Sequence, residues 1–309
     1  MRRGARAGYD TAMKSLAWIC LVVLASCAAN SNDSKSSART VAAKELPPDH
    51  QRALSAYARG GETWELERKA VLADKRLCTF VVENLALELI KAHRALAGAD
   101  ADRALPAFQR AREELVRFEA MAIPTLVGLL EVADAVAATT VASVLTDIGQ
   151  PAVEALEPLL SASSSETRRR AAAALEHLPH AGNRVEGRVR AHLIECFERE
   201  SDWATRTALA RAIGARGSRD ADVVPWRNAL QAGLLDADVL VAEASAEGLA
   251  NLGDARAVPV LIDVLSRASQ HGDLRRFQAV QTALVRLTHQ AEKGSVEAWR
   301  AWWDGQPRR

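Results

Sequence analysis

Apolar side chains recur every three or four positions along most of the chain, and one arrangement of them returns several times. The segments AIPTLVGLL at 122, AVEALEPLL at 152 and AVPVLIDVL at 257 are versions of the same pattern. Apolar residues spaced i, i+3 and i+7 lie on one face of a helix, so each segment predicts an amphipathic helix. Taking the first Val or Ile as the register, the copies begin at Ile123, Val153, Val189, Val223 and Val258, with spacings of 30, 36, 34 and 35 residues.

Each copy continues into a second apolar helix pattern, so the repeating unit is a helix pair. Pro124 and Pro259 stand at the start of first helices, where the missing N–H group costs nothing. Gly149, Gly214 and Gly253 are expected to close second helices, because a helix end favours a left-handed residue, and Pro179 is expected to end the second copy. No sustained alternation of apolar and polar residues appears, which predicts an all-α fold without a sheet.

Helix pairs of this length, with proline opening the first helix and glycine closing the second, resemble HEAT repeats over residues 122–288, in about five copies. The resemblance implies an α-solenoid of stacked antiparallel helix pairs whose second helices line the concave face. It also implies an aspartate and an arginine at the head of each second helix. Asp202 and Arg206 supply both in the third copy, whereas Asp238 has no accompanying arginine. Tetratricopeptide repeats have a similar period, but their Trp, Gly and Tyr signature is absent.

A stack of helix pairs exposes an apolar face at each end unless another element covers it. Residues 62–121 predict two or three helices that cap the N-terminal side. Residues 289–309 include SVEAWRAWWDGQ, in which Trp299, Trp302 and Trp303 are spaced to lie on one side of a short helix. We interpret these rings as a plug for the last repeat, and an exposed aromatic platform for a sugar or peptide is the alternative.

The N-terminal segment has the layout of a secretory signal peptide over residues 1–26. A lysine at position 14 precedes a short apolar run, which is too short to span a bilayer as a helix. The following Leu-Ala-Ser-Cys, ending at Cys27, resembles the lipobox of bacterial lipoproteins. This resemblance implies export and a lipid anchor on Cys27, with the choice of inner or outer membrane left open. An ordinary signal peptide is the alternative, and Met13 is a second candidate start. Residues 27–61 are predominantly small and polar, which predicts a flexible tether.

Composition narrows the function classes. Forty basic and 39 acidic residues leave a formal net charge of +1, without the basic excess of a nucleic-acid-binding protein. Cys78 and Cys196 lie far apart in apolar helix patterns, as small buried hydrophobes do, so no disulfide framework is predicted, and their redox state stays open.

A search for catalytic chemistry finds little. The seven histidines are scattered, and the pair His177 and His180, at a helix end around Pro179, is expected to face solvent rather than bind zinc. Glycine-rich phosphate loops and the Gly-x-Ser-x-Gly elbow are both absent from the sequence. We therefore expect no cofactor, no metal and no enzymatic activity.

One charged cluster is a candidate binding surface. It comprises arginines on second helices of adjacent copies: Arg168, Arg169, Arg170, Arg206 and Arg211. They are candidates for a basic stripe that binds an acidic peptide or polymer; a solvated helix surface or ion-pair ladders between repeats are the alternative.

The favoured function is a non-catalytic scaffold, anchored to a membrane of the cell envelope, that binds a protein or peptide along the array. The alternatives are an enzyme of lyase or glycosylase type on a HEAT-like fold and a purely structural envelope protein. Export argues against both enzyme types, whose substrates are cytoplasmic. The identity of the partner and the oligomeric state are not predicted.

Overall fold

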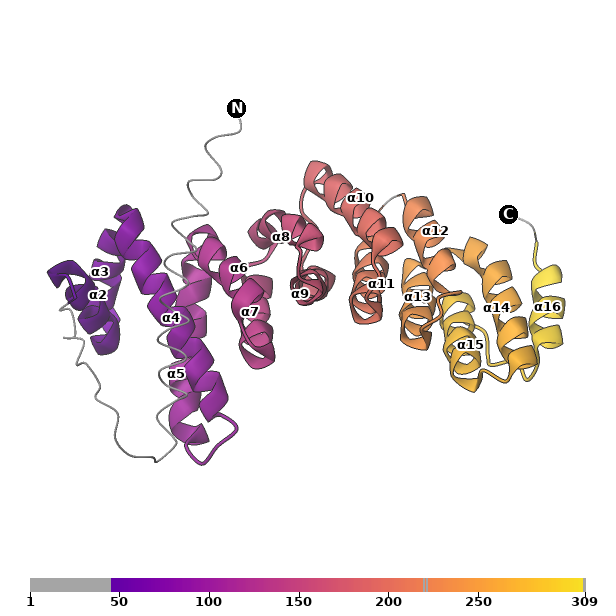
Figure 1. The fold of residues 1–309 in the computed structure, drawn as a ribbon, viewed down its shortest axis with the longest axis horizontal. Coiled ribbons are helices and arrows are strands. Elements are labelled where there is room, and N and C mark those ends of the chain that lie inside the picture. Colours follow the sequence, from indigo (N-terminus) through magenta and orange to yellow (C-terminus); the bar gives the residue numbers. More distant parts are fainter. Residues whose placement is uncertain (1–45, 219, 221, 308–309) are drawn as a thin grey trace. The chain divides into compact units, whose positions relative to one another are not determined.

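A computed structural model describes residues 46–218, 220 and 222–307 (Figure 1). Within these ranges every regular element is a helix and no β-strand occurs, so the all-α prediction is confirmed. No helix in the described part of the chain combines the length and apolar character needed to cross a bilayer. The expected signal peptide, Cys27 and the first part of the expected tether lie outside the described residues.

The described residues divide into two compact units that meet between residues 141 and 142, inside α7 (Ala135–Ile148). The boundary expected between the capping helices and the array was at residues 121 and 122. The difference arises because α6 (Ile123–Val132), the first helix of the first copy, packs against α4 (Lys75–Ala95) of the first unit. The other elements of this unit are α2 (Pro48–Arg59), α3 (Gly61–Ala73), α5 (Ala101–Arg117) and the 3-10 helix η2 (Glu119–Met121).

The prediction of a flexible tether as far as residue 61 was wrong for its last part. Helix α2 occupies residues 48–59 and buries Ala53, Ala56 and Tyr57 against its neighbours. The Tyr57 ring meets Trp64 of α3 edge to face, with ring centroids 5.4 Å apart. Two alanines and one tyrosine do not make an apolar pattern that predicts a packed helix. The tyrosine ring nevertheless buries a large apolar area when it packs against Trp64.

The second unit is a row of antiparallel helix pairs (Figure 1). Its first helices are α8 (Gln150–Leu156) with η3 (Glu157–Ser161), α10 (Asn183–Arg199), α12 (Val224–Gly233) and α14 (Val258–His271), the last preceded by η4 (Ala255–Ala257). Its second helices are α9 (Ser165–His177), α11 (Trp203–Gly217), α13 (Val239–Leu252) and α15 (Leu274–Thr288). Consecutive second helices pack directly against one another, α9 on α11, α11 on α13 and α13 on α15. This translational stacking is the predicted solenoid.

Every second helix in this unit begins with a polar side chain that caps its N-terminus. The caps are Ser164, Asp202, Asp238 and Asp273, and each side chain accepts a hydrogen bond from a backbone N–H group in the first turn of its helix. Such caps satisfy otherwise unpaired donors and fix where the chain turns from the first helix into the second.

The predicted helix boundaries hold at most of the proline and glycine positions. Pro124 and Pro259 occupy first turns, and Gly253 ends α13 in the left-handed region with φ of 68°. Gly214 was wrongly expected to end its helix, because α11 continues to Gly217 and Gly214 is buried inside it. The first helix of the second copy changes to a 3-10 helix at Glu157, next to Pro158, which cannot supply the N–H group of an α-helical hydrogen bond.

The C-terminal helix α16 (Val296–Asp304) packs on α14 and covers the end of the row, as predicted for a cap. The three tryptophans differ in burial: Trp299 is fully buried, whereas Trp302 and Trp303 are half-buried. The Trp299 and Trp302 rings meet edge to face at 5.8 Å, and the ammonium of Lys293 lies 5.5 Å and 5.7 Å from their respective centroids. Trp299 is therefore the plug.

We expect Trp299→Ala to lower the free energy of unfolding by about 3 to 5 kcal/mol, because it removes a fully buried ring and leaves a cavity. Trp302→Ala is the matched control on the same helix and should cost less, since part of that ring already contacts water. Urea unfolding followed by circular dichroism measures both. Equal losses for the two variants would contradict the assignment of Trp299 as the plug.

Candidate functional site

The turns between first and second helices in the second unit are joined by an arginine ladder. Arg168, at the head of α9, donates two hydrogen bonds to the Glu200 carboxylate, at 2.7 and 2.8 Å, and others to the carbonyls of residues 162 and 163. Arg206, at the head of α11, does the same one repeat later, with Asp236 at 2.8 and 2.9 Å and the carbonyls of residues 200 and 201. Bidentate pairs of this kind fix both distance and orientation between neighbouring repeats.

The repeat whose second helix, α13, lacks this arginine is joined to the next repeat by an arginine of α15. Ala242 stands in α13 where Arg168 and Arg206 stand in α9 and α11, four residues after the N-cap, so no guanidinium extends forward from this position. Instead Arg276, in the first turn of α15, donates to the backbone carbonyl of Asp236 at 2.8 Å. The arginine ladder, which we define as Arg168, Glu200, Arg206, Asp236 and Arg276, thus continues through the gap in the sequence pattern.

Two glycines allow α11 and α13 to approach closely. A Cβ atom added to Gly214 would lie 2.4 Å from the Cα atom of Gly248, so no side chain fits at this crossing. Real Cβ atoms do not approach backbone at such a distance, and the contact requires glycine. Between the first helices α10 and α12, the ring of Phe197 reaches Gly233, where an added Cβ atom would lie 2.8 Å from it.

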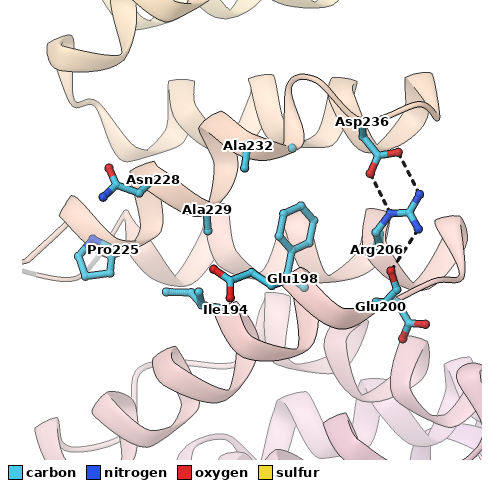
Figure 2. Close-up of a pocket in the computed structure, with 11 residues that line it drawn as sticks. Ile194, Glu198, Glu200, Arg206, Pro225, Asn228, Ala229, Ala232 and Asp236 are labelled. Atoms are coloured by element: carbon cyan, nitrogen blue, oxygen red, sulfur yellow. Dashed lines mark hydrogen bonds and ion pairs between the residues drawn. The ribbon is translucent and has the colours of Figure 1, made fainter.

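A cleft of about 650 Å³ lies between α10 and α12 (Figure 2). Ile194, Phe197 and Glu198 contribute from α10, and Ala229 and Ala232 contribute from α12. The remaining lining residues are Glu200, Arg206, Pro225, Asn228, Gly233 and Asp236. The small residues of α12 leave the space open, and the α10 side chains supply an apolar wall.

The electrostatics of the cleft are acidic. Arg206 is the one basic residue in its lining, and its guanidinium is already paired with Asp236 (Figure 2). Glu200 is paired with Arg168, which keeps the pKa of its carboxyl below the ordinary value, chiefly through the side-chain hydrogen bond. Glu198 is exposed and forms no ion pair with any residue that the structure describes. The cleft therefore offers one unpaired carboxylate beside apolar side chains.

The five arginines predicted as a basic stripe do not form one exposed surface. Arg168 and Arg206 belong to the arginine ladder, and Arg169 and Arg170 both pair with Glu166 of their own helix. Arg211 is exposed and has no ion pair within the described part of the chain. Most of the positive charge is thus balanced locally, so the stripe offers little attraction for an acidic polymer.

Sequence reasoning missed a buried ion pair that holds three helices together. Arg216 of α11 is fully buried, and its Nε donates to Glu186 of α10 at 2.7 Å. Its Nη1 donates to the carbonyl of Leu175 of α9 at 2.9 Å. The spacing of 30 residues between the partners carries no periodic signal. A buried charge of this kind is tolerated only when its hydrogen-bonding capacity is used.

His180 is tied to the same pair rather than facing solvent, contrary to expectation. Its Nε2 donates to the backbone carbonyl of Arg216 at 2.8 Å, while His177 is exposed. Cys78 is buried as expected, whereas Cys196 is only half-buried. Within the described ranges no group of three or more His, Cys, Asp or Glu side chains could hold a metal ion.

Comparison with known proteins agrees with this geometry. A family model described as HEAT repeats matches residues 190–283, from α10 to α15. The matched region contains the whole cleft and most of the arginine ladder. No curated protein matches the chain.

Solved structures that match the chain include engineered proteins. One engineered protein shares 20% identity, with 65% of this chain and 96% of that chain covered and a TM-score of 0.39. A designed armadillo repeat protein in complex with the peptide (KR)4 shares 16% identity, with 64% and 99% covered and a TM-score of 0.40.

The pair of Arg168 and Glu200 predicts a pH-dependent stability. Because the folded-state pKa of Glu200 lies below the ordinary 4.5, its stabilisation is present above that value and is lost as the pH falls through the folded pKa. Arg168→Met should lower the free energy of unfolding near neutral pH by about 1.5 to 3 kcal/mol. It should also weaken the loss of stability on acidification.

Urea unfolding at about pH 6 and about pH 3.5 measures this dependence, which reflects the different proton uptake of the folded and unfolded states. Arg211→Met is the control, since Arg211 pairs with no described carboxylate. Wild-type pH dependence in Arg168→Met would show that the ion pair contributes nothing to acid sensitivity.

Proposed function

We propose that this chain is an interaction scaffold that holds a segment of a partner protein in the cleft between α10 and α12. The segment carries an apolar side chain next to a lysine or arginine. The observation that carries the proposal is the combination of an apolar wall, formed by Ile194 and Phe197, with the unpaired carboxylate of Glu198.

The dimensions of the cleft support a peptide occupant. Its volume of about 650 Å³ lies within the range of sites that enclose small molecules or a few side chains. Three of the residues that α12 (Val224–Gly233) contributes are small: Ala229, Ala232 and Gly233. An extended chain can lie against these small residues and place one apolar side chain beside Phe197.

The charge of the cleft supports a basic partner. An arginine of the partner would not displace Arg206 from Asp236, because Arg206 also donates hydrogen bonds to two carbonyls of its own turn. Glu198 alone offers a new pair. A partner with an acidic residue at that point would meet the unpaired carboxylate of Glu198, so like-charge repulsion selects against it.

Binding in this cleft is non-catalytic in our proposal. The residues that line it include no serine, cysteine or histidine, so no hydroxyl or thiol nucleophile lies beside an imidazole base there. The helical array provides the binding surface, and the partner provides the segment that binds to it.

A pair of charge reversals on α10 tests the proposal. Glu198 and Glu195 are both exposed on this helix, but only Glu198 lines the cleft. With a photo-crosslinking amino acid at Ala232, an exposed position in the lining, the partner is captured in cells that express the full chain. Glu198→Lys should reduce the yield at least about tenfold, the equivalent of roughly 1.4 kcal/mol.

Glu195→Lys should leave the crosslinking yield close to that of the wild type. A crosslinker at Arg211, on a second helix of the same region, reports on the arginine surface instead. A product formed from Arg211 and absent from Ala232 would overturn the cleft as the binding site. Equal effects of the two lysine variants would remove the role assigned to Glu198.

We further propose that the scaffold is exported and anchored to a membrane by lipid on Cys27. The support is the Leu-Ala-Ser-Cys motif after a short apolar run, which is typical of bacterial lipoprotein signals. A single acyl chain binds membranes only marginally, so stable anchoring requires more than one chain or a second membrane contact. Anchoring would confine the search for a partner to the membrane surface.

Metabolic labelling with a palmitate analogue tests the anchor. The full chain should incorporate the label and sediment with membranes, and Cys27→Ser should abolish both. Cys20→Ser, which changes the cysteine inside the apolar run, is the control and should still be labelled. Undiminished label in Cys27→Ser would exclude lipidation at this residue.

A further inference from the structure

Three side chains outside the cleft form a hydrogen-bonded relay. Ser161 Oγ lies 2.6 Å from Nε2 of His192, and Nδ1 of the same imidazole lies 2.7 Å from Oε1 of Glu157. In the tautomer that donates from Nδ1 to the carboxylate, Nε2 accepts a hydrogen bond from the serine hydroxyl. A hydroxyl, an imidazole and a carboxylate in this order are the arrangement that activates a serine nucleophile.

Local structure explains why the three meet. Glu157 and Ser161 are the first and last residues of the 3-10 helix η3, which places them four positions apart, and His192 lies on α10 in the next repeat. The periodic pattern expected an apolar residue at His192, because it occupies the position held by Leu126, Leu156 and Leu261 in other copies. The histidine at position 192, between two repeats, therefore departs from the apolar pattern, and the packing of the repeat does not require it.

The site is accessible to a small molecule. Ser161 is exposed, and the side chains of His192 and Glu157 are 19% and 21% exposed. The imidazole and carboxylate are thus partly sheltered while the hydroxyl faces solvent. An imidazole held by a carboxylate, next to a hydroxyl that solvent reaches, meets the nucleophile and base part of the geometry needed for acyl transfer.

The nearby Cys196 is not the nucleophile. Its Sγ lies 3.9 Å from Ser161 Oγ and donates to the carbonyl of Leu160 at 3.3 Å. Burial raises the pKa of this thiol above its ordinary value, so the reactive thiolate is scarce at neutral pH. Arg168, whose guanidinium binds the carbonyl of residue 162 next to Ser161, places a positive charge beside the turn.

We propose that Ser161 is a nucleophile activated by His192, with Glu157 orienting the imidazole, and that it reacts with activated acyl esters. Ser161 Oγ attacks the carbonyl carbon while its proton passes to Nε2 of His192. The C–O bond to the leaving group then breaks, and the alcohol leaves with that proton. Water, deprotonated by the same imidazole, hydrolyses the acyl-serine and releases the carboxylic acid.

The inference is independent of the scaffold proposal. None of the three relay residues lines the cleft between α10 and α12. Partner capture through Glu198 and reactivity at Ser161 can therefore succeed or fail separately. The same hydrogen bonds also hold η3 against α10, and a purely structural role predicts no reaction with an electrophile.

Labelling with a fluorophosphonate probe tests the nucleophile. The purified full chain should form a covalent adduct, and tandem mass spectrometry should place it on Ser161, a readout that needs no variant. Ser161→Ala should abolish the adduct, whereas Ser163→Ala, two residues away and also exposed, should retain it. His192→Gln, which keeps a hydrogen-bonding side chain but cannot act as a base, should lower the labelling rate at least about a hundredfold.

Hydrolysis of p-nitrophenyl acetate provides the second measurement. The wild type should exceed the Ser161→Ala background, with a burst of nitrophenolate equal to the protein concentration if the acyl-serine accumulates. Thermal melts of all variants check that the fold is kept. Absence of an adduct on Ser161 in the wild type, or equal labelling of the wild type and His192→Gln, would overturn the proposal and leave the relay a structural contact.

Discussion

The contact of Gly214 with Gly248 determines how the central repeats of the second unit are arranged. Because neither residue has a side chain, α11 and α13 approach as closely as their backbones allow. The first helices of the same two repeats, α10 and α12, border the cleft, and Phe197 of α10 lies in its lining. The proposed binding site therefore belongs to the two repeats that the glycine contact joins.

The arginine ladder keeps this geometry in register. Hydrophobic faces alone permit neighbouring helix pairs to slide, because apolar contact is non-directional. Bidentate pairs such as Arg206 with Asp236 have one favourable geometry, and their carbonyl contacts tie the guanidinium to its own turn. The same residues set the charge at one end of the cleft. Stability of the stack and selectivity of the site thus depend on shared side chains.

The sequence predicted helix boundaries correctly where the boundary depends only on residues of the same helix. Pro124, Pro259 and Gly253 were placed correctly because each acts through its own backbone. Reasoning was wrong where a distant residue decides, as at Gly214, whose role depends on Gly248, and in α2, whose apolar face is meaningful only against Trp64. The arginines were recognised as a group, but their partners were not, because Glu200 and Asp236 lie 32 and 30 residues away.

The amino-acid sequence by itself determined the helical class, the repeat period and the capping of the row at its C-terminal end. These follow from local periodicity, which is set by the geometry of a single helix. Tertiary structure decided which charges are paired, where the cleft opens and that Ser161, His192 and Glu157 share a relay. Such features join residues from different repeats, and their distances depend on how the helix pairs stack rather than on the pattern within any one of them.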